Sequence, residues 1–225
     1  MIEADLEQKG LANGPVPANA RPEYGKAYRE LANRQEHPKP PVPVEAILRP
    51  PDARRHDIMI LGSAGQRVIT AGELLGIAAM SAGLHVTQKN DYDITVLRGP
   101  SISELILAPG EIDYPEIVQP SVILALAPEG VARRSNAFAG ADKDALVIRA
   151  SDVDIPETKA KIRVVDFKQM GLRAQDWAVA ALAVLATMQT VIDGAMLETA
   201  LTHRFRGNVL DAAKAVVHTA MSHSV

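Results

Sequence analysis

Residues 58–67 read IMILGSAGQR, a run of four apolar residues followed by a loop that holds two glycines. Beyond Arg67, apolar side chains recur at helical spacing as far as Gly83, with Leu74, Leu75 and Ala78 on one face. A short apolar run, a glycine-containing turn and an amphipathic segment predict a buried strand, a tight loop and a helix. This unit is the start of an α/β fold.

The rest of the chain continues the alternation of strands and helices. Further strands are predicted at 84–88, 94–97, 102–107, 121–126, 145–148 and 162–165. Helices are predicted at 128–138, from Trp177 to Val191, and in two more segments that Gly194 and Gly207 punctuate and that end near His218. The sequence therefore predicts a three-layer α/β sandwich with a mostly parallel sheet.

Residues 1–56 have a different composition, because nine of the fifteen prolines lie before residue 52. Proline fixes φ and removes a donor, so the segment 38–43 should be extended. Only 23–35 has a helical pattern, with one apolar stripe. The segment is either a tail without fixed structure or, as we prefer, an arm that wraps a partner chain. The predicted domains are this proline-rich arm, 1–56, and an α/β domain, 57–225.

Composition excludes several classes of function. A formal net charge of −3 offers nucleic acid no general attraction. The chain has no cysteine, which excludes disulfides, a catalytic thiol and a cysteine-ligated iron–sulfur cluster within it. The acidic first residues do not resemble a secretory signal, and the longest apolar run, 177–186, is half of the roughly twenty residues that span a bilayer. We expect a cytoplasmic protein without a membrane or nucleic-acid partner.

The loop at 62–67 is the strongest candidate for a binding site. In an open α/β sheet, ligands bind beyond the carboxyl ends of the strands, where a helix start offers free amides to an anion. The G-x-G-x-x-G dinucleotide pattern fails here, because Ala64 and Arg67 occupy glycine positions. A turn that binds nothing is the alternative interpretation.

The wider segment, 58–75, resembles the start of the gamma subunit, or gamma domain, of 2-oxoacid:acceptor (ferredoxin) oxidoreductases. That family typically reads G-x-G-G-Q-G-V-x-x-A-G-x-x-L at this point. The residues in register with it are Gly62, Gly65, Gln66, Val68, Ala71, Gly72 and Leu75. A tyrosine followed by an arginine and glycines is the next family landmark, for which this chain offers Tyr92 and then Arg98-Gly99. The resemblance covers roughly 57–217 and leaves the arm outside.

Three departures from the family pattern affect the loop. Ala64 and Arg67 replace glycines, and Pro100 replaces the second glycine after Arg98. We expect the Arg67 cation either to bind a phosphate or to block the site.

The resemblance implies an enzyme that oxidatively decarboxylates a 2-oxoacid with thiamine diphosphate and Mg, passes electrons through [4Fe-4S] clusters, and releases an acyl-coenzyme A. It implies that the gamma part caps the active site and helps to receive coenzyme A, while the other cofactors are bound elsewhere. The partners implied are thiamine-binding alpha and beta subunits and a ferredoxin-like subunit in a hetero-oligomer. Ferredoxin, or NAD through a flavin subunit, would accept the electrons.

On this basis we expect no catalytic residue and no metal ligand in the chain. The amides of residues 63–66 would face a phosphate of coenzyme A, and Gln66 would hydrogen-bond its pantetheine or the substrate. Arg98 would bind a phosphate or carboxylate, or form a structural salt bridge. The predicted cofactor-binding residues are Gly62, Ser63, Ala64, Gly65, Gln66, Arg67 and Arg98.

Other candidate residues are weaker. His203 and His218 have no metal-ligand spacing, and Ser63 lacks the frame of a hydrolase nucleophile. The pairs 54–55 and 133–134 are arginines that suit solvated faces or contacts with another subunit. Two other functions fit the same residues: a free-standing nucleotide- or coenzyme A-binding protein, and a purely structural subunit whose loop binds nothing.

Overall fold

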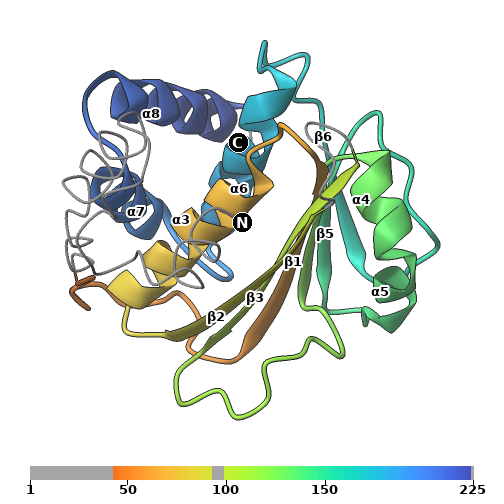
Figure 1. Ribbon diagram of the computed structural model, residues 1–225, viewed down its shortest axis with the longest axis horizontal. Helices are drawn as coiled ribbons and strands as arrows, with labels where there is room; N and C mark the ends of the chain where they lie inside the picture. Colours follow the sequence, from red (N-terminus) through yellow and green to blue (C-terminus); the bar gives the residue numbers. More distant parts are fainter. Residues whose placement is uncertain (1–42, 93–98, 224–225) are drawn as a thin grey trace, which may run out of the picture. The chain divides into compact units, whose positions relative to one another are not determined.

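The computed structural model describes residues 43–92 and 99–223, and Figure 1 shows a sheet with helices on both of its faces. The described strands form one six-stranded sheet in the order β2-β3-β1-β4-β5-β6. Their bounds are β1 His56–Ser63, β2 His85–Tyr92, β3 Pro100–Ala108, β4 Val122–Ala125, β5 Leu146–Ala150 and β6 Lys161–Val165. The predicted α/β class is confirmed. The strand predicted at 94–97, the helix at 23–35 and most of the arm lie outside the described residues.

The sheet is mixed rather than uniformly parallel. β1 pairs with β4, β4 with β5, and β5 with β6 in parallel, whereas β3 pairs antiparallel with both β1 and β2. A short connection between β2 and β3 explains the difference, because a parallel return needs a crossover of a dozen or more residues. The parallel half therefore holds β1 and β4–β6, whose carboxyl ends lie along one edge of the sheet.

Helices cover the two faces of the sheet unequally (Figure 1). One face carries α3 Val68–Ser81, α6 Trp177–Thr187, α7 Gly194–Arg204 and α8 Gly207–Ser222, and the other carries α4 Pro128–Arg133 and α5 Ser135–Gly140. The predicted helix 128–138 is in fact two short helices, because the backbone leaves helical geometry at Arg134 (φ −124°, ψ 32°). Pro128 begins α4 as expected, since a proline needs no amide partner at that position.

The apolar run at 177–186 is a core helix. Each residue of the run is at most 6% exposed, and α6 packs against both α3 and α8. A helix that is apolar on all sides must be buried on all sides, which accounts for its alanines and the close approach of its neighbours. Among the described residues, no helix combines the length and the apolar composition that crossing a membrane requires.

Candidate functional site

The loop 62–67 joins β1 to α3 at the edge of the sheet where the four parallel strands end (Figure 1). A cleft of about 420 Å³ lies beside it. The lining residues come from the loop and from the segments that follow β4, β5 and β6: Ser63, Gln66, Leu126, Ala127, Pro128, Glu129, Asp152, Val153, Lys168, Leu172, Ala174 and Trp177. The predicted position of the site at the carboxyl strand ends thus coincides with a cleft.

Gln66 holds the loop together from inside. Its Oε1 accepts a hydrogen bond from the Ser63 amide at 2.9 Å, and its Nε2 donates to the Leu126 carbonyl at 3.2 Å. The residue is only 5% exposed. The amide group therefore ties the loop to the residue that follows β4, and it keeps one lone pair and one N–H for a further partner.

Replacing Gln66 by methionine should lower the free energy of unfolding by about 2 kcal/mol, because a buried donor and a buried acceptor both lose their partner. Urea denaturation would measure this. Gln119→Met is the matched control, since Gln119 is exposed and makes a single 3.4 Å hydrogen bond to Asp142. Equal midpoints for the two variants would contradict the role assigned to Gln66.

The loop amides are not equally available to a ligand. Ser63, Ala64 and Gln66 donate to Gln66 Oε1, the Gly99 carbonyl and the Ser63 carbonyl, respectively. Gly65 differs: its φ is +88°, it is exposed, and a Cβ built on it would have no atom of residues 43–92 or 99–223 within 4 Å. The open face of the loop is therefore at Gly65. Arg98, the remaining predicted ligand, lies outside the described residues, next to Gly99.

Arg67 adopts the left-handed conformation that a glycine would favour, with φ 54° and ψ 32° immediately before α3. Its guanidinium neither fills the loop nor blocks the cleft. Instead, Nη1 lies 3.5 Å from Oδ1 of Asp176, at the start of α6, and the side chain is 54% exposed. This contact joins the loop to the segment 174–177, of which Ala174 and Trp177 line the cleft.

Helix α4 approaches the loop through Gly130. A Cβ at this position would lie 2.5 Å from the Gly62 nitrogen and 2.6 Å from the Leu61 carbonyl carbon. Both atoms belong to the backbone, which cannot move aside as a side chain would. The absence of a side chain at Gly130 therefore lets α4 begin directly against the end of β1.

The cleft is also lined by the salt-bridged Asp152 and Lys168 and by Trp177, which packs on the buried Phe167. Lys168 Nζ lies 2.6 Å from Asp152 Oδ2, and this hydrogen bond lowers the pKa of Asp152 and raises that of Lys168. Trp177 stacks on Phe167 with ring centroids 5.5 Å apart, and its Nε1 donates to the Leu172 carbonyl at 3.1 Å. Sequence reasoning missed these lining residues, because they come from three separate segments that carry no spacing signal.

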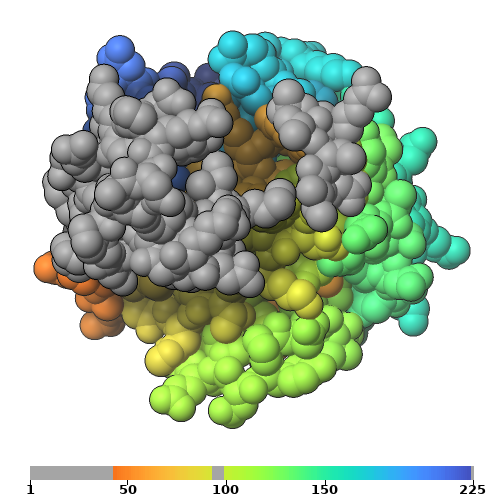
Figure 2. Space-filling view, viewed as in Figure 1, coloured from red at the N-terminus to blue at the C-terminus, as the bar shows by residue number. Residues whose placement is uncertain are grey.

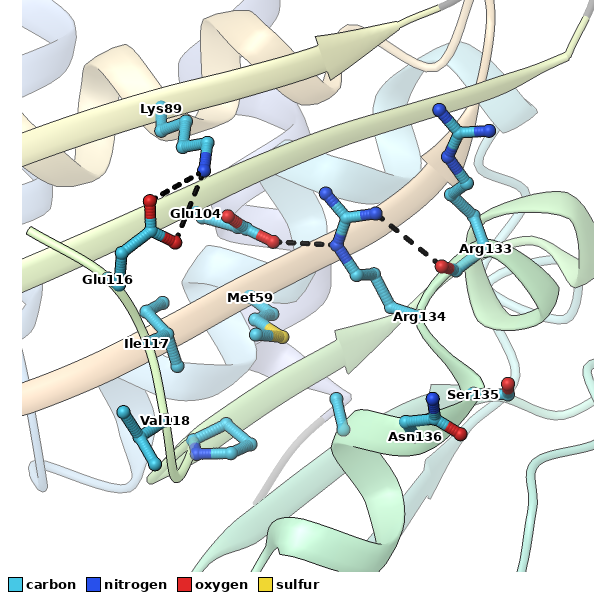
Figure 3. A pocket seen from close by; sticks show the side chains of 12 residues that line it. Met59, Lys89, Glu104, Glu116, Ile117, Val118, Arg133, Arg134, Ser135 and Asn136 are labelled. Atoms are coloured by element: carbon cyan, nitrogen blue, oxygen red, sulfur yellow. Dashed lines mark hydrogen bonds and ion pairs between the residues drawn. The ribbon is translucent and has the colours of Figure 1, made fainter.

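A second cleft, of about 400 Å³, lies on the side of the sheet that carries α4 and α5 (Figure 3). Arg134 is not a solvated residue there: it pairs with Glu104 at 2.7 Å and with Asp91 at 2.9 Å. Lys89 pairs with Glu116 at 3.0 Å. These acids neutralise the cations that line the cleft, which makes it a poor match for a phosphate.

The segment between β3 and β4 closes one side of this second cleft. Figure 2 shows it (yellow-green) beside α4 and α5 (green) on the molecular surface. Its Tyr114 and Val118 are 57% and 78% exposed.

Within the described ranges, no group of three histidine or acidic side chains is arranged to hold a metal ion.

The sequence profile described as pyruvate ferredoxin/flavodoxin oxidoreductase matches residues 57–223. The 2-oxoglutarate synthase subunit KorC of Methanothermobacter marburgensis is 36% identical over 78 residues, which are 34% of this chain and 42% of that protein. KorC of Methanocaldococcus jannaschii is 30% identical over 76 residues, 33% of this chain and 41% of that protein. The matches thus span about two fifths of these relatives.

Solved structures share the fold. The gamma subunit of a keto/oxoacid ferredoxin oxidoreductase from Geobacter sulfurreducens superposes with a TM-score of 0.61 at 20% identity, covering 75% of this chain and 98% of that one. A 2-oxoglutarate:ferredoxin oxidoreductase from Magnetococcus marinus, solved with 2-oxoglutarate, coenzyme A and succinyl-CoA bound, gives 0.64 at 14% identity, covering 77% and 31%. At these identities, the likeness is one of fold.

Proposed function

Since this chain belongs to the pyruvate ferredoxin/flavodoxin oxidoreductase family, we propose that it is the gamma subunit of a 2-oxoacid:acceptor oxidoreductase complex and helps to bind coenzyme A beside the active site. Thiamine diphosphate with Mg and the [4Fe-4S] clusters belong to partner subunits; when bound there, they supply the decarboxylation and the electron transfer. This chain has no cysteine with which to bind such a cluster. The complex would be cytoplasmic.

The observation that carries the proposal is the open face of the loop at Gly65, at the carboxyl ends of the parallel strands. No atom of the described residues lies within 4 Å of a Cβ built on Gly65, so within this part of the chain a ligand phosphate has room to approach the backbone. Helix α3 begins at Val68, directly behind the loop, and the positive end of its dipole favours an anion. The cleft of about 420 Å³ alongside offers space for the rest of the ligand.

The residues of this chain would bind and orient coenzyme A without taking part in bond breaking. The open loop would receive a phosphate, Gln66 would keep the loop in shape through Ser63 and Leu126, and Trp177 would form an apolar wall. We take 2-oxoglutarate as the first substrate to test, because the KorC relatives are subunits of 2-oxoglutarate synthase.

Purification of the affinity-tagged chain from its native cells tests the proposal against its two rivals. We expect a stable brown complex with a thiamine-binding subunit and a cysteine-rich subunit, and an N-terminal arm that cross-links to a partner. A colourless monomer that binds coenzyme A would favour the free-standing binding protein. A brown complex whose KM for coenzyme A is indifferent to every change in the loop would favour the structural subunit.

A further inference from the structure

Two arginines converge on a single buried acid at the rim of the cleft. Asp176 lies 3.5 Å from Arg67 Nη1 through Oδ1 and 3.5 Å from Arg173 Nε through Oδ2. The Asp176 side chain is 11% exposed, whereas those of Arg67 and Arg173 are 54% and 78% exposed. One carboxylate thus holds two guanidiniums whose outer faces remain open to solvent.

Arg67, Arg173 and Asp176 form a cluster with a net charge of +1. Asp176 precedes α6 but makes no side-chain capping bond to the amides of that helix, so its carboxylate serves the arginines. Lys168, whose Nζ lies 5.9 Å from the centroid of the Trp177 ring, is already matched by Asp152 at 2.6 Å. The excess positive charge therefore lies on the side of Arg67 and Arg173, next to the cleft residues Gln66 and Ala174.

The backbone of Arg67 points to a use for its side chain. A left-handed conformation costs a non-glycine residue free energy, on the order of 1 kcal/mol, and such residues cluster at ligand sites. An Asn at this position would be cheaper and a Gly cheaper still. The backbone conformation alone therefore does not account for a long cationic side chain at this position.

We propose that Arg67 and Arg173 form a pair that binds a phosphate group of the ligand, with Asp176 fixing the spacing of the two guanidiniums. This inference rests on the proposed function, since coenzyme A is the phosphate ester expected in the cleft. Guanidinium groups bind phosphate oxygens by bidentate, charge-assisted hydrogen bonds. Two of them at one rim suit a phosphate monoester or diphosphate better than a carboxylate, because phosphate carries more charge and more acceptor oxygens.

The test uses the assembled complex and measures the Kd of coenzyme A by calorimetry. Arg173→Gln and Arg67→Asn should each weaken binding about tenfold, the loss of one charge-assisted contact. Pantetheine, which lacks phosphate, should bind the parent and both variants equally. Dephospho-coenzyme A distinguishes the two phosphate sources: if the pair binds the 3′-phosphate, the variants will not weaken this analogue; if it binds the diphosphate, they will.

Arg54→Gln is the matched control. Arg54 is 69% exposed and pairs with Asp52 at 2.6 Å, but it lies just before β1, at the opposite end of that strand from the cleft. Its loss should leave the Kd unchanged. Unchanged Kd values for both Arg67→Asn and Arg173→Gln, in a parent complex that binds coenzyme A, would overturn the pair while leaving the proposed function standing. A parent complex that binds no coenzyme A would overturn both.

Discussion

Gly130→Ala is expected to destabilise the protein by about 3 kcal/mol, although glycine to alanine inside a helix ordinarily stabilises it by about 1 kcal/mol. The new methyl group would lie 2.5 Å from the Gly62 nitrogen and 2.7 Å from the Gly62 oxygen. These are backbone atoms at the end of β1, so relief requires α4 to separate from the sheet.

Gly130→Ala should also weaken coenzyme A binding, because Gly62 is the first residue of the loop. We therefore expect a higher KM for coenzyme A in the complex together with the lower denaturation midpoint. Gly110→Ala is the control: Gly110 is exposed, and its added methyl group would meet no described residue within 4 Å. Identical urea midpoints for the two variants would mean that α4 does not need its close approach to β1.

Gly65→Asp should raise the KM for coenzyme A at least tenfold more than Gly65→Asn does. Both side chains tolerate the left-handed backbone that φ +88° imposes, and both enter the open space in front of the loop. They differ only in the negative charge of the aspartate. At a distance of about 6 Å from a phosphate, this repulsion is of the order of 2 kcal/mol at the effective dielectric constant of a protein surface.

The comparison between aspartate and asparagine removes the effects of bulk and of backbone strain. Both variants should unfold at similar urea concentrations, and their activities should converge at high salt as the repulsion is screened. The KM values for coenzyme A are measured with the 2-oxoacid saturating. Equal values for Gly65→Asp and Gly65→Asn at low salt would place the phosphate away from the loop.

The fold class could be predicted from the sequence, and a cleft lies beside the loop where the sequence predicts the site. The apolar run before Gly62, the glycines of the loop and the helical spacing after Arg67 are local signals, and each has its predicted counterpart in β1, the loop and α3. The burial of the apolar run at 177–186 could likewise be predicted, because a helix that is apolar on every side has to be buried.

The details that tertiary packing decides could not be predicted. The prediction that Gln66 contacts the ligand did not include its structural hydrogen bond to the Leu126 carbonyl, which lies sixty residues away in the chain, just after β4. The contact of Arg67 with Asp176, 109 residues away in the chain, could not be predicted either. The antiparallel course of β3 depends on a short connection whose length, rather than its composition, sets the strand direction.

Steady-state turnover of the complex, prepared with and without this chain, tests the central proposal most directly. With the chain present, we predict that a 2-oxoacid and coenzyme A yield an acyl-coenzyme A while ferredoxin is reduced, and that Gly65→Asp raises the KM for coenzyme A with little change in the KM for the 2-oxoacid. The proposal is contradicted if the remaining subunits form acyl-coenzyme A at the same rate and with the same KM for coenzyme A when this chain is absent.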